Sequence, residues 1–122
     1  MSMKDTCVSV WDVLPVGIGA GASLTSTINL GGLRLFGIAM PSQWTAANLT
    51  FQTSPDAGST WVNMLDQDGN EILAVAEAST YIALNTPAHF APVQFLRIRS
   101  GTLSTPVSQS AACTLNLILR GV

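Results

Sequence analysis

Turn-forming residues recur along this chain about every 8–12 positions, and the segments between them are rich in Thr, Val, Ile and Leu. This spacing is typical of a β-sandwich or barrel. No segment shows a sustained helical period. We therefore expect an all-β, antiparallel β-sandwich of about eight to nine strands, over residues 7–11, 23–30, 33–40, 48–54, 60–66, 71–76, 80–84, 94–100 and 112–120.

Two late segments alternate between apolar and polar residues. Residues 94–100 place Arg97 and Arg99 on one face and their apolar neighbours on the other. Because successive side chains of a strand point to opposite faces, we expect both arginines to point outward. The segment 112–120 alternates in the same way, and the residues of its predicted core face are Cys113, Leu115, Leu117 and Leu119.

The segment from 33 to 40 differs, because it is apolar on both faces apart from Arg34. Such a pattern predicts a central strand that is buried on both sides. After it, Ser42 is placed to cap one short helical turn over residues 43–47. Residues 55–58, Pro-Asp-Ala-Gly, predict the tight turn of a hairpin.

Charge is scarce in the chain: five basic and seven acidic residues among 122, with 48% hydrophobic residues. No stretch of about 20 mostly apolar residues would cross a membrane, and the arginines and lysine are too few and scattered to follow nucleic acid. A small soluble domain usually has roughly a quarter of its surface charged. We therefore expect one domain over residues 1–122 that assembles with protein partners, with residues 1–22 as a partly extended N-terminal arm.

Enzymatic chemistry is not expected. The glycine-rich run over residues 16–21 superficially resembles a nucleotide-binding loop, but a Ser/Thr-rich strand follows it rather than the helix which that motif requires. His89 is the single histidine, and no serine lies in a Gly-x-Ser-x-Gly elbow. We expect no catalytic residues and no cofactor.

A cluster of acids offers the one candidate metal site. Asp66, Asp68 and Glu71 surround Gly69, with Asp56 in the neighbouring turn. Carboxylates at alternate positions bind calcium in some loops, yet this one lacks the distant bidentate Glu of an EF-hand. We expect a solvated turn without metal, with weak calcium binding as the alternative.

The two cysteines lie near opposite ends of the chain, at Cys7 and Cys113. Their spacing fits neither a metal motif nor a disulfide framework. The first residues show no signal-peptide pattern, so we expect synthesis in the cytoplasm. There both thiols are expected to be reduced and buried, with a bridge between terminal strands as the alternative.

Tryptophan and arginine side chains are the candidates for recognition. Trp44 lies in a predicted connection, where an exposed indole would anchor a protein interface or stack on a sugar ring. Trp61 opens a predicted strand and is expected to be partly buried. The residues proposed for a protein interface are Trp11, Met40, Trp44, Arg97 and Arg99.

Two stretches carry a resemblance to a known class. Residues 49–61 read LTFQTSPDAGSTW and residues 95–102 read FLRIRSGT, followed by Pro106-Val107 and the final strand. From about Gln43 onward the chain resembles the decoration, or cement, proteins of tailed bacteriophages, which have a jelly-roll fold. That resemblance implies a non-enzymatic subunit on the outside of the virion capsid. It also implies the major capsid protein as partner and a homo-oligomer, dimer or trimer.

Two alternatives remain open at this point. A carbohydrate- or receptor-binding sandwich of a phage tail or fibre would use Trp44, Trp61 and the acidic turns. The strand order is also undecided, since a jelly roll and an immunoglobulin-like sandwich have similar strand counts.

Overall fold

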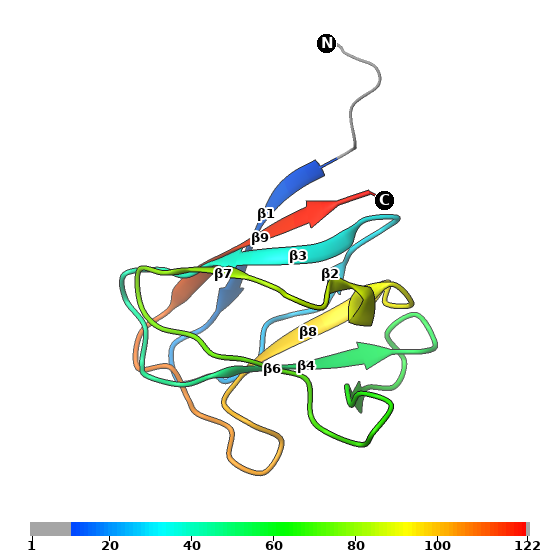
Figure 1. Ribbon diagram of the computed structural model, residues 1–122. Coiled ribbons are helices and arrows are strands. Elements are labelled where there is room, and N and C mark those ends of the chain that lie inside the picture. Colours follow the sequence, from blue (N-terminus) through cyan, green and yellow to red (C-terminus); the bar gives the residue numbers. More distant parts are fainter. Residues whose placement is uncertain (1–10, 122) are drawn as a thin grey trace.

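The computed structural model describes residues 11–121 and consists of two antiparallel sheets that form separate layers (Figure 1). One sheet has the order β1-β9-β3-β7; the other has the order β2-β8-β4-β5, and β6 also pairs with β4. The fold class is thus confirmed as an all-β sandwich. The strands are β1 (Trp11–Ile18), β2 (Ile28–Asn29), β3 (Arg34–Ala39), β4 (Leu49–Ser54), β5 (Val62–Asn63), β6 (Leu73–Ala74), β7 (Tyr81–Ala83), β8 (Phe95–Ser100) and β9 (Cys113–Arg120).

Strand pairing decides between the two sandwich topologies. The antiparallel pairs are nested along the chain: β1 with β9, β2 with β8, β3 with β7 and β4 with β5. The long hairpin is rolled up so that β3 lies beside β9 and β4 lies beside β8. This arrangement is a jelly roll.

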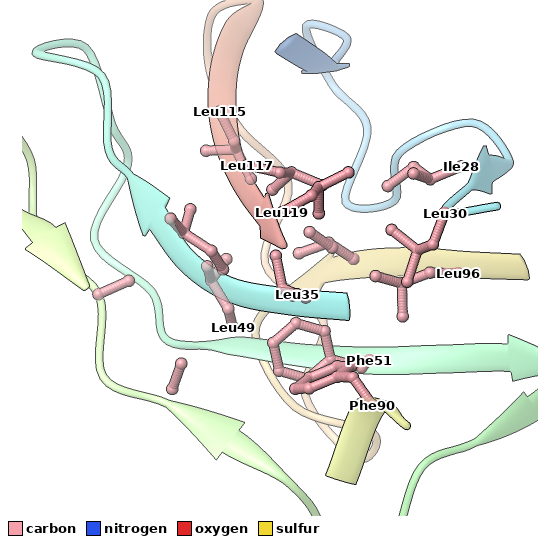
Figure 2. Packing of buried hydrophobic residues seen from close by; sticks show 14 of the residues in the cluster. Ile28, Leu30, Leu35, Leu49, Phe51, Phe90, Leu96, Leu115, Leu117 and Leu119 are labelled. Atoms are coloured by element: carbon pink, nitrogen blue, oxygen red, sulfur yellow. The ribbon is translucent and has the colours of Figure 1, made fainter. Parts of the chain in front are cut away.

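The core lies between the two sheets, where side chains from both layers meet (Figure 2). In β9 the four predicted core residues are buried and the residues between them are exposed or half-exposed, which confirms the alternation. Phe51 of β4 contacts Phe90 edge to face, with ring centroids 5.1 Å apart. The 3₁₀-helix η1 (Pro87–Phe90) carries Phe90 into this core. Each fully buried side chain of this size contributes about 1.5–3 kcal/mol.

Strand β3 has the predicted central position, between β9 and β7. Its core-facing residues Leu35 and Ile38 are fully buried, but Arg34, Phe36 and Ala39 are only half-buried. The prediction that both faces are covered is therefore wrong. The apolar character of the strand has a different consequence: the outer face of this sheet stays open and carries little charge.

The N-terminal part differs from the expected arm in its described portion. Residues 11–18 form β1, which pairs with β9 along its whole length, while residues 1–10 lie outside the described residues. Pro15 is compatible with this strand because β1 is at the edge of its sheet, where a missing N–H is tolerated. The glycine-rich run after Pro15 suggested a loop; residues 16–18 instead pair with β9, whereas residues 19–21 form a turn as expected.

The predicted helical turn over residues 43–47 is also wrong, since this segment contains only bends and irregular backbone. The indole Nε1 of Trp44 donates instead to the carbonyl oxygen of Ala47, at 3.1 Å. Within residues 11–121, no helix has the length and apolar content that a membrane crossing requires.

Candidate functional site

The outer face of the sheet β1-β9-β3-β7 carries no charge over most of its area. Cross-strand partners share a face, so one row runs from Tyr81 through Ala39 and Asn116 to Pro15. A second row holds Ala83, Gly37, Ile118 and Val13. We call this surface the uncharged face, and its side chains are Val13, Pro15, Ala39, Tyr81, Ala83, Thr114, Asn116 and Ile118.

Tyr81 is the largest side chain on the uncharged face and is 62% exposed. It lies against Gly37 of β3: a Cβ atom at position 37 would come within 3.2 Å of the Tyr81 hydroxyl oxygen and 3.0 Å of the Ile82 carbonyl oxygen. Glycine therefore leaves the space that this ring occupies. Neither residue was singled out from the sequence, because their proximity depends on the register of β3 with β7.

The outer face of the other sheet carries several polar groups that are paired within the molecule. The predicted outward direction of Arg99 is correct, but its predicted exposure is wrong, because the side chain is buried. Its guanidinium forms an ion pair with Glu71 at 3.4 Å and donates to the side-chain oxygens of Asn63 and Thr50. Arg99 thus holds the segments around β5 and β6 on the sheet and offers little surface to a partner.

Arg97 is half-buried on the same face. Its guanidinium carbon lies 4.1 Å from the centroid of the Trp61 ring, a cation–π contact. One face of this indole is therefore covered, in agreement with the expected partial burial.

The other predicted interface residues are not brought together on one surface. Met40 is 7% exposed and belongs to the core. Trp44 is half-buried and packs against that core. Trp11 begins β1, and its side chain is outside what the structure describes. Trp44 is the member of the set that lies at an uncharged part of the surface.

That part consists of three neighbouring loops, which we call the loop end: residues 19–22, 42–47 and 107–112. All sixteen of these residues are uncharged and most are Gly, Ala, Ser or Thr. A hollow of about 240 Å³ lies between the second and third loops and is lined by Trp44, Thr45 and Ser110 among others.

Gln109 joins the three loops and was missed by the sequence reading. Its side chain is 1% exposed and accepts from the Thr45 N–H at 2.8 Å. The same amide donates to the Thr45 carbonyl at 3.0 Å and to the Ser100 hydroxyl at 2.7 Å. Its backbone bonds to Gly21 and Ala22 of the first loop. A lone glutamine in a Ser-rich loop carries no sequence signal for this role.

The acidic residues do not converge. Asp66 accepts the backbone N–H groups of Asp68 and Asn70 within its own turn, and the bond from Asn70 lowers its pKa most. Glu71 binds Arg99 and the Leu103 N–H instead. Within residues 11–121, no three His, Cys, Asp or Glu side chains lie close enough together to hold a metal ion.

Asp56 stabilises the predicted hairpin turn. Its carboxylate accepts the N–H and the hydroxyl of Thr60 and the hydroxyl of Ser54, and these bonds lower the pKa of Asp56. In β9, burial raises the pKa of the Cys113 thiol. Cys7 lies outside the described residues.

A larger hollow of about 460 Å³ lies at the opposite end of the sandwich. Met64 and Val93 line it together with polar groups of Asn63, Asp66 and His89. Neither Trp44 nor Trp61 borders it. This hollow therefore does not combine Trp44 or Trp61 with the acidic turn of Asp66.

These features define the chain as a jelly-roll sandwich with one open, uncharged sheet face and an uncharged loop end. A scan against protein-family models finds no match, and neither does a search of curated proteins. Among solved structures, the chain is similar to the crystal structure of the SPBc2 prophage-derived protein YomS. The TM-score is 0.54 with 13% sequence identity, over 94% of this chain and 98% of that chain. At this identity the likeness shows the fold.

Proposed function

We propose that this protein is a structural component of a bacteriophage particle that binds the outside of the capsid and stabilises the shell. The observation that carries the proposal is the likeness to a prophage-derived protein over nearly the whole of both chains. The match covers the jelly roll in both proteins, so it supports a phage origin for this chain.

The surface chemistry supports a role in protein assembly. The uncharged face and the loop end make up large parts of the described surface. They lack the charge that keeps a small domain dispersed, and they contain no cluster of catalytic groups. Surfaces of this kind are suited to contact with other protein. A subunit that binds the assembled shell and not the free capsid subunits stabilises the shell by mass action.

The loop end is the surface that we assign to the shell. Its three loops contain small residues that allow close approach, and Gln109 holds them in one arrangement before binding. Little ordering is then required on contact, which favours affinity. Trp44 at its margin supplies the aromatic group that interface centres often contain.

The test is co-sedimentation of the protein with empty capsids of the phage that encodes it, followed by heating of the complexes. We expect the protein to pellet with capsids and to raise the temperature at which they break. Ala46→Lys puts a charge on the exposed loop end and is expected to abolish co-sedimentation. Ala91→Lys, equally exposed beside η1, is the matched control and should bind normally. A protein that fails to bind capsids in any state would overturn the proposal.

The alternative, a glycan- or receptor-binding module, predicts a different outcome. It requires an exposed aromatic platform, yet Trp61 is covered on one face by Arg97 and Trp44 is half-buried. A glycan array with the purified protein discriminates between the two functions. Glycan binding that disappears in Trp44→Ala would favour this alternative over capsid decoration.

A further inference from the structure

The uncharged face is open in the described structure. On the outer face of the other sheet, Arg97 stacks on Trp61 and Arg99 is buried in its ion pair with Glu71. On the uncharged face, Tyr81 is 62% exposed and Val13 is 43% exposed, with Ile118 half-exposed between β1 and β3. A sheet face of this composition marks an interaction site or an aggregation hazard.

The size of this face is suited to a modest interface. Neighbouring strands lie ~4.8 Å apart and rise ~3.3 Å per residue. Strands of eight, eight, six and three residues therefore present roughly 400 Å². Two such faces in contact would bury about 800 Å², which is in the range of weak, transient protein–protein interfaces.

Charges at the two ends of the face suggest how two copies would align. Arg34 and Arg120 are cross-strand partners at one end, with Asp12 nearby on β1. At the other end, the loop that leads into β7 carries Glu77, which is exposed. Suppose that two copies stack face to face with equivalent strands running in opposite directions. The arginine end of each copy then lies over the Glu77 end of the other. If equivalent strands ran in the same direction, the arginines of both copies would lie together.

Tyr81 lies on the edge strand β7, and its ring covers Gly37 of β3. Its neighbours on the face are Gly37, Ala39 and Ala83. Tyrosine side chains are enriched among the residues that contribute most to protein–protein binding. A two-fold axis uses the same face on both subunits.

We propose that the uncharged face binds the same face of a second copy of this chain, with strands in opposite directions, and forms a two-fold dimer. The uncharged surface of each copy is then withdrawn from water, and each Arg34 lies near the partner's loop before β7. The dimer does not depend on capsid binding, because the proposed shell contact uses the loop end.

Light scattering of the purified protein from low micromolar to millimolar concentration tests the dimer. We expect a monomer–dimer equilibrium with a dissociation constant on the order of micromolar, as the small area suggests. Asn116→Lys places a charge in the middle of the face, on an exposed position of β9, and should weaken the dimer at least about tenfold. Gln94→Lys makes the same change at an exposed position before β8 and should leave it unchanged.

The alignment of the two copies is tested by charge reversal. Arg34→Glu and Glu77→Lys should each weaken the dimer, and the double variant should restore part of the affinity. Thermal unfolding followed by circular dichroism establishes that each variant is folded. Thr114→Lys, on the same strand and face, repeats the central test if Asn116→Lys lowers stability.

Two results would overturn the inference: a monomer over the whole concentration range, or an oligomer that Asn116→Lys and Thr114→Lys leave intact. Failure of the two proposals is distinguishable. A dimer that never pellets with capsids retains the inference and removes the proposed function. A monomeric variant that still binds capsids supports both assignments of surface.

Discussion

Gln109 provides the sharpest test of how the loop end is held together. We predict that Gln109→Met, which keeps most of the side-chain volume and removes all its hydrogen bonds, destabilises the protein by about 3 kcal/mol. Three bonds of 2.7 to 3.0 Å are lost, and each contributes roughly 1 kcal/mol net. The Ser100 hydroxyl is fully buried and loses one partner, whereas the half-buried Thr45 groups regain water more readily.

The assay is urea unfolding followed by circular dichroism, with Gln94→Met as the matched control at an exposed glutamine. A loss of about 3 kcal/mol should also lower the melting temperature by roughly 10 °C in a domain of this size. The variant should still fold, since domains are typically stable by about 5–15 kcal/mol. If Gln109→Met and Gln94→Met differ by less than about 0.5 kcal/mol, the three bonds do not hold the loops and the argument is refuted.

Three further predictions concern the core, the hairpin turn and the polar sheet face. Leu117→Asp should abolish folding, because Leu117 is fully buried and an unpaired charge there is costly; the measurement is the circular dichroism spectrum of the soluble fraction. The lowered pKa of Asp56 means that its contribution to stability is present above its ordinary pKa of 3.8 and is lost as the pH falls through the lowered value. NMR titration should show Thr60→Val raising the pKa of Asp56 towards 3.8, and an unchanged pKa would contradict the assignment. Arg97→Ala should leave the fold intact and cost about 0.5–1 kcal/mol through loss of the contact with Trp61, measured by urea unfolding.

Several charged residues form interactions within the domain. Arg99 is buried with Glu71, and Asp56 and Asp66 cap their own turns. These groups serve the stability of the domain. The surfaces left for recognition carry little charge apart from Arg34, Arg120 and Glu77 at the ends of the uncharged face, so a partner would be recognised mainly through shape and burial of apolar area, with these charges setting its alignment.

The amino-acid sequence by itself determined the class of fold and the positions of β3, β4, β8 and β9, but not that of β1. The alternation in β9 and β8 and the turn after β4 were read correctly because a strand with one buried face must repeat with a period of two residues. That pattern reports which side chains point towards the core. It contains no information on what covers the opposite side.

Tertiary structure decided the remainder. The nested strand pairing, the burial of Arg99 and the openness of the uncharged face all depend on which distant segments lie side by side. Gln109 and Thr45 are 64 residues apart, so no local pattern predicts their bond. Alternation is a local property of the chain, whereas the covering of an outer face is set by contacts between residues far apart in sequence, and only the folded chain brings those together.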